Sequence, residues 1–138
     1  MIRNSLFTLL TIAILIIISS CSRDPKNDKG VGPITSVTLS EINKDLAMQG
    51  KGIFDEKCST CHRMDVNGVG PSLKNITVRR TPEWIMNMML NPEQMISENA
   101  DAKKLSENYM MHMKPLGLNE QSARAILEYL RFFDNGNK

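Results

Sequence analysis

The sequence is short of aromatic residues and has few cysteines. Phe, Trp and Tyr make up only 5% of its 138 residues, and its three cysteines cannot all pair with one another. The formal net charge is +2, with basic and acidic residues interspersed, so the chain lacks the concentrated basic surface of a nucleic-acid-binding protein. Leu, Ile and ten methionines supply part of the apolar bulk of a core. A large apolar cofactor could supply the rest.

The chain also lacks a hydrophobic run long enough to cross a bilayer, which takes about 20 residues. Its main apolar run covers residues 6–18, follows the basic Arg3, and is separated from Cys21 by two serines. This arrangement predicts a signal peptide over residues 1–20, and its end resembles a bacterial lipobox. We therefore expect Cys21 to carry lipid and to anchor an exported protein that faces the periplasm or the cell exterior. A cleaved signal that leaves Cys21 free and a retained membrane helix are the alternatives.

The polar segment that follows has the composition of a linker. Residues 22–36 include two Pro and two Gly and show no periodicity that would form a core. We predict a flexible, lipid-anchored tether over residues 21–38 and one folded domain over residues 39–138.

Helical periodicity dominates the rest of the chain, and no segment alternates as a strand does. Capping residues, Pro and Gly mark the ends of the expected helices: Thr81 and Asn119 are expected to cap the starts of two of them, and Asn91-Pro92 is expected to end one. These helices cover about residues 39–58, 82–90, 98–109 and 120–133. The sequence thus predicts an all-α domain of about four short helices, with long loops that are expected to wrap around a bound group.

One short motif, CSTCH at residues 58–62, carries the clearest chemistry. On one turn of helix, Cys58, Cys61 and His62 project to the same side. The two thiols can then attach to one edge of a porphyrin, with the imidazole under the metal, and C-x-x-C-H is the signature of c-type haem attachment. A zinc site needs four ligands, and the only other histidine is His112. A redox dithiol is typical of a βαβ unit, which is missing here. Both alternatives are therefore less favoured than haem.

A haem iron bound by His62 has a second axial position, which carriers commonly fill with methionine. Candidates gather about fifty residues downstream, in a segment expected to be a loop. Met113 is our first choice because the rigid Pro115 follows closely. The alternatives are Met110, Met111 and His112.

Together, these features resemble monohaem class I cytochromes c over roughly residues 45–133. The resemblance depends on four matches: a helix with Gly50 and Phe54 leading into the CSTCH motif, the sequence GPSL at residues 70–73, Met113 shortly before a proline, and a last helix ending AILEYLRFF. One departure from the family pattern is Lys114, which separates the methionine from the proline.

The resemblance implies a cytochrome c fold with one haem c, bound covalently to Cys58 and Cys61 and ligated by His62 and Met113. It implies that the Pro71 carbonyl accepts a hydrogen bond from the proximal histidine. It also implies that the helix with Gly50 and Phe54 crosses the last helix near Tyr129 and Leu130. Three further residues are expected near the haem: Arg79, Arg80 and Trp84.

The expected function is electron transfer without catalysis. A monomeric, membrane-anchored carrier would exchange electrons with redox partner proteins, such as a respiratory complex or a terminal reductase or oxidase, and would bind no nucleic acid. Two alternatives stay open. One is a haem enzyme or gas sensor with a displaceable sixth ligand, and the other is a cytochrome subunit of a larger respiratory complex.

Overall fold

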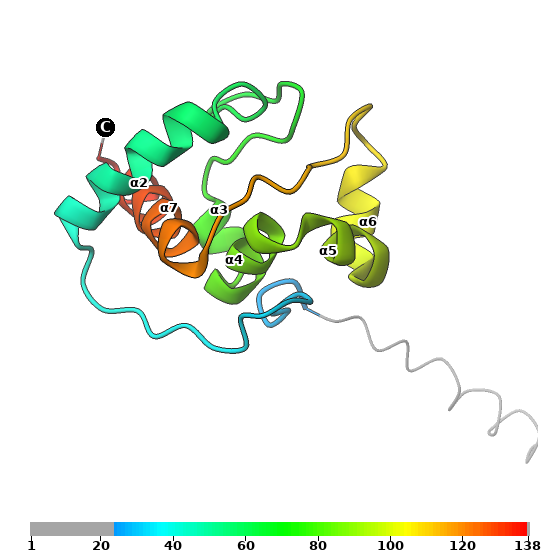
Figure 1. Ribbon diagram of the computed structural model, residues 1–138, viewed down its shortest axis with the longest axis horizontal. Coiled ribbons are helices and arrows are strands. Elements are labelled where there is room, and N and C mark those ends of the chain that lie inside the picture. The colour runs from blue at the N-terminus through cyan, green and yellow to red at the C-terminus, as the bar shows by residue number, and fades with distance from the viewer. Residues whose placement is uncertain (1–23, 138) are drawn as a thin grey trace, which may run out of the picture.

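The computed structural model describes residues 24–137 of this chain, and within that range it contains helices and no strands (Figure 1). The predicted all-α class is therefore confirmed. The structure adds two short helices, α3 and α5, to the four that were expected. The helices are α2 (Lys44–Lys57), α3 (Ile76–Arg79), α4 (Pro82–Leu90), α5 (Pro92–Glu98), α6 (Ala100–Ser106) and α7 (Glu120–Asp134).

Side-chain caps fix where the main helices begin. Asn43 accepts a hydrogen bond from the Leu46 amide, so α2 begins later than the periodicity predicted. Thr81 caps α4 as expected. The pair Asn91-Pro92 was expected only to end a helix, but Pro92 also starts α5, because proline suits the first position of a helix.

The helices α2 and α7 cross with their backbones in close contact. A Cβ atom at Gly50 would collide with the carbonyl group of Ala125, so only glycine allows this approach. One turn further on, the rings of Phe54 and Tyr129 pack at 5.4 Å between centroids. The crossing that the family resemblance implied is therefore confirmed.

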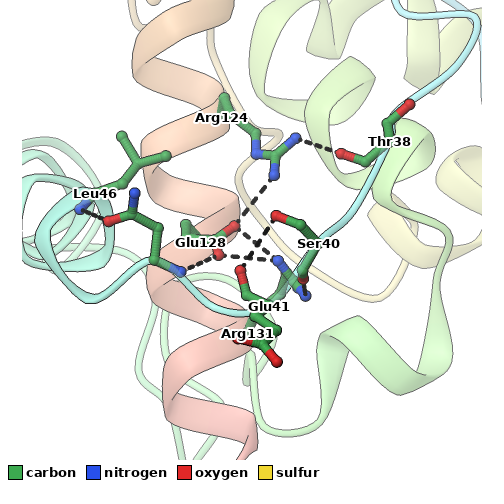
Figure 2. Close-up of polar contacts among 8 residues, drawn as sticks. Thr38, Ser40, Glu41, Leu46, Arg124, Glu128 and Arg131 are labelled. Carbon is green, nitrogen blue, oxygen red and sulfur yellow. Dashed lines mark hydrogen bonds and ion pairs between the residues drawn. The ribbon is translucent and has the colours of Figure 1, made fainter.

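A buried carboxylate attaches the chain before α2 to α7 (Figure 2). Glu128 is 1% exposed, and it accepts two hydrogen bonds of 2.9 Å from Arg131 and one of 2.8 Å from the Asn43 amide. Burial of this charge is tolerated because it is paired and hydrogen-bonded. Arg124 and Arg131 also donate to the carbonyl groups of Thr38 and Ser40.

The segment predicted to be a flexible tether differs from that expectation over residues 28–37, whereas residues 24–27 are exposed and form only a local turn. Residues 28–37, called the strap from here on, lie along α4 and α5 (Figure 1). Ile34 of the strap belongs to the hydrophobic core. Composition suggested a linker, but the strap is held by tertiary contacts that no local pattern shows. The proposed lipidation site Cys21 and the predicted signal peptide lie outside the described residues.

No helix among residues 24–137 is both long enough and apolar enough to cross a membrane.

The crossing of α2 and α7 gives a matched pair of substitutions. Gly50→Ala should lower the free energy of unfolding by at least about 2 kcal/mol, because the new methyl group meets rigid backbone. Gly52→Ala, on the same helix, meets nothing within 4 Å and should raise stability by up to about 1 kcal/mol through helix propensity. Urea unfolding of the two variants measures both effects. Equal stabilities would mean that the helices do not touch at Gly50.

Candidate functional site

The CSTCH motif begins where α2 ends. Cys58 is the C-cap of the helix, and its carbonyl accepts hydrogen bonds from the Cys61 and His62 amides at 3.1 and 2.9 Å. This tight turn keeps all three side chains on the wall of one cavity. Both thiols are free, so Cys58 and Cys61 are not joined in a disulfide.

The Cys58 thiol is poorly suited to thiolate chemistry. Its side chain is buried, and burial, with a smaller contribution from neighbouring Cys61, raises its pKa to about 11. At neutral pH the free thiol is therefore protonated.

His62 is held in one tautomer by the loop that follows it. Its Nδ1 lies 2.9 Å from the Pro71 carbonyl oxygen. A carbonyl can only accept, so Nδ1 must carry the proton and donate it. The lone pair is then on Nε2, the nitrogen that remains available to a metal. The hydrogen bond expected from the family resemblance is thus present.

Gly70 makes this geometry possible, although no role of its own was predicted for it. A Cβ atom at position 70 would lie 2.7 Å from Cε1 of the His62 ring. The Gly70 amide also donates to the Cys61 carbonyl at 2.9 Å, which closes the loop against the motif. The signal for this role was the GPSL sequence, in which glycine precedes the accepting proline.

The cavity is apolar and is shared by segments far apart in the sequence. The CSTCH turn contributes Cys58, Cys61 and His62, and a loop fifty residues downstream contributes Met113. Most of the remaining lining comes from aliphatic and sulfur side chains, among them Leu73, Ile85, Met88, Met89, Leu105 and Leu130. Two thiols and an imidazole at the edge of an apolar space fit an iron porphyrin. Such a group would also supply the apolar bulk that the aromatic-poor sequence lacks.

The four candidates for the second axial ligand are placed differently. Met113 is half-buried and packs against the core. Met111 and His112 also line the cavity but are exposed. Met110 is fully exposed and is not part of the lining.

The residues expected near the haem all line the cavity, but each already has partners. The Arg79 guanidinium donates to loop carbonyls of Ser72 and Lys74. Arg80 forms a 2.6 Å ion pair with Asp101 and stacks over the Trp84 ring at 4.6 Å.

Asn99 connects the cavity wall to the strap, and sequence reasoning missed it. The Trp84 indole donates to the Asn99 side-chain oxygen at 3.4 Å, and the Asn99 amide donates to Asp28 of the strap at 2.7 Å. The only local signal was its position as the cap of α6.

Comparison with known proteins agrees with these observations. Residues 47–132 match the family model for cytochrome c. Cytochrome c from Rhodothermus marinus shares 44% sequence identity at a TM-score of 0.75, covering 77% of this chain and 92% of that one. An engineered cytochrome c from the same organism, bound to a carbene intermediate, shares 44% identity at a TM-score of 0.71, covering 76% and 92%. The cytochrome c domain of the pp3183 protein from Pseudomonas putida shares 29% identity at a TM-score of 0.58, covering 63% and 89%. No curated protein sequence matches this chain.

The contact between Gly70 and His62 can be tested directly. Gly70→Ala should displace the imidazole and weaken its hydrogen bond to Pro71, because the methyl group would overlap the ring. We expect faster solvent exchange of the His62 Nδ1 proton, measured by NMR, and a loss of about 1–3 kcal/mol in stability. Gly52→Ala serves as the control. An unchanged exchange rate in Gly70→Ala would contradict the close approach.

Proposed function

This chain belongs to the cytochrome c family, and on that premise we propose that it is an exported electron carrier held at a membrane by lipid on Cys21. The protein carries one covalent haem c, the cofactor of its family. One observation carries the role of electron carrier: a single apolar cavity collects Cys58, Cys61, His62 and Met113 from two distant segments.

We assign the covalent bonds to the haem to Cys58 and Cys61, and the proximal axial position to His62. When bound, the haem supplies one-electron chemistry between the ferrous and ferric states of its iron. The Pro71 carbonyl fixes the imidazole tautomer and the direction of its free Nε2. Gly70 leaves the space in which the ring lies. The proximal side is therefore organised by this chain's own backbone.

We assign the distal position to Met113, because its half-buried thioether faces the cavity from a loop and packs against the core. A methionine ligand raises the reduction potential of a cytochrome c. With both axial positions filled by the protein, no substrate needs to bind. Little rearrangement is then needed during transfer, and this arrangement supports a carrier and not an enzyme.

The exposed side chains around the cavity indicate where a partner makes contact. Val69 and Met111 line the cavity and are also exposed, and Cys61, which also lines it, is partly exposed. A redox partner protein, such as a respiratory complex or a terminal reductase or oxidase facing the periplasm, would approach here. The contacts would be brief, and membrane attachment would raise the effective concentration of the carrier near such a partner.

One observation favours a second function, a haem enzyme or gas sensor with a displaceable distal ligand. Among the described residues, the segment 110–118 that carries Met113 makes no hydrogen bond to another part of the chain. A ligand on such a loop leaves more easily than one on a hydrogen-bonded element. One engineered relative is bound to a carbene intermediate, so a protein similar to this chain holds a small group.

Replacement of the distal ligand separates the two functions. Met113→Ala should abolish the methionine-to-iron charge-transfer band of the ferric protein and lower its reduction potential, because the thioether ligand is lost. Visible spectroscopy and redox titration measure both effects. Met110→Ala is the matched control and should change neither, since that side chain is fully exposed.

The unsubstituted protein provides the complementary result. A carrier with a firmly bound Met113 should not bind carbon monoxide when reduced. Rapid binding of carbon monoxide would favour the enzyme or sensor, and loss of the band in Met111→Ala or His112→Ala instead of Met113→Ala would overturn the assignment of the ligand.

The lipid anchor is tested by Cys21→Ser. This variant should move from the membrane fraction to the soluble exported fraction and keep the visible spectrum of its haem, because the folded domain is unchanged. Fractionation and a reduced-minus-oxidised spectrum measure both properties. Persistent membrane attachment would indicate an uncleaved signal segment.

A further inference from the structure

The helix α4 separates the cavity from the strap. Trp84 and Met88, together with the residues that follow each of them, line the cavity. Glu83 and Asn87 lie one turn apart on the opposite side of the helix, because residues four apart share a face. Both are buried, and both bind the strap. The strap and the cavity are therefore on opposite sides of α4.

Asn87 is the main attachment point of the strap. Its side chain is 1% exposed and makes three hydrogen bonds to strap backbone. The amide nitrogen donates to the carbonyl groups of Lys29 and Ile34 at 3.0 and 2.9 Å, and the amide oxygen accepts from the Ile34 amide at 2.9 Å. In a sheet, a neighbouring strand would bind the backbone groups of an extended segment. Here the Asn87 side chain binds them instead.

Further contacts secure both ends of the strap. At one end, Glu83 accepts from the Val37 amide at 3.1 Å. At the other end, Asp28 is buried, and its carboxylate accepts from Asn99 at 2.7 Å. The Asp28 carbonyl accepts from the Thr81 hydroxyl at 2.6 Å. The chain is therefore fixed to the domain from Asp28 onward.

Because the chain between Cys21 and the strap is short, the attachment of the strap limits how the domain can be oriented at a membrane. Cys21 is seven residues before Asp28, and fully extended chain spans at most about 3.6 Å per residue, or about 25 Å here. Residues 24–27 form a turn, which shortens this reach. A domain of about 100 residues has a radius of gyration of about 13 Å, which corresponds to a sphere about 34 Å across. The link is thus shorter than the domain. A tether ending at residue 38 would have reached about 60 Å.

We propose that the strap fixes the face of the domain that lies against the membrane, and so holds the mouth of the cavity toward the aqueous phase. The chain leaves the domain on the strap side of α4, whereas the loops at residues 63–75 and 110–118 lie on the other side (Figure 1). The exposed lining residues Val69 and Met111 belong to these loops and mark the mouth of the cavity. Turning the mouth toward the membrane would need a link longer than the domain. The inference rests on the proposed anchor at Cys21 and adds an orientation to it.

The test uses the haem-containing protein with a single fluorophore, attached through azidophenylalanine at an exposed position. Thr35 reports on the strap side and Val66 on the mouth side. Protein purified from membranes is placed in phosphatidylcholine vesicles that carry nitroxide on the lipid headgroups. We expect the label at Thr35 to be quenched several-fold more than the label at Val66. The ratio with and without nitroxide removes the constant quenching by the haem.

A spacer variant is the matched control. About 20 Gly and Ser residues inserted after Lys26 have an r.m.s. reach of about 25 Å and leave the strap intact. Quenching at the two positions should then become similar. Asn87→Ala should have the same effect by releasing the strap, and the spacer variant decides the matter if Asn87→Ala fails to fold. Equal quenching in the chain without a spacer, or stronger quenching at Val66, would overturn the inference.

An error in the proposed lipid anchor can be distinguished from an error in the proposed orientation. Mass spectrometry of the purified protein shows whether Cys21 carries lipid. If it does not, the proposed anchor is wrong, and the orientation is measured on the same chain coupled through Cys21 to a maleimide lipid. Several-fold stronger quenching at Thr35 would still support the strap as the orienting element, and equal quenching would refute it.

Discussion

The contact of α2 with α7 at Gly50 is the constraint on which the cavity depends. Because the two backbones meet there, the direction of α2 is fixed by α7 and not by flexible side chains. The packing of Phe54 against Tyr129 fixes the rotation of α2 about its own axis. The helix then ends at Cys58, so the turn that follows lies at the cavity wall in one orientation. Gly70 and Pro71 need only adjust the last side chain of that turn.

A second dependence links α4 to the strap. A helix with an apolar cavity on one side would normally expose its other side to water, and polar residues such as Glu83 and Asn87 would suit that role. Instead, both are buried under the strap, and they bind backbone amides of the strap that would otherwise have no hydrogen-bond partner. The side chains of Glu83 and Asn87 and the backbone of the strap satisfy each other's hydrogen bonds. Without its partner, each of these buried polar groups would be unpaired at a cost of about 1–3 kcal/mol. This explains why Asn87 makes three hydrogen bonds within one short stretch.

What could be predicted from the sequence was local. The CSTCH turn, the cap at Thr81 and the cap at Asn119 all follow from residues within a few positions of each other, and the structure has them. The strap could not be predicted in this way, because Pro and Gly promote flexibility only where nothing distant binds the backbone. Here the partner of Ile34 is Asn87, 53 positions away. The short helix α3 was missed because four residues are too few to show a period, and α5 was missed because Pro92 was interpreted only as the end of a helix.

The two sides of the cavity are organised to different degrees, and this bears on how the protein can act. The proximal loop is held by backbone bonds to the motif, by the His62–Pro71 hydrogen bond and by Arg79, which joins the Ser72 and Lys74 carbonyls. In the part of the chain that the structure describes, the loop of Met113 has no comparable hydrogen bonds. Its position depends on the packing of Met113, Leu116 and Leu118 against the core and on any bond that the Met113 sulfur makes. With the proposed ligands, the protein would lose Met113 before His62 when destabilised, so ligand exchange would begin on the side of the loop.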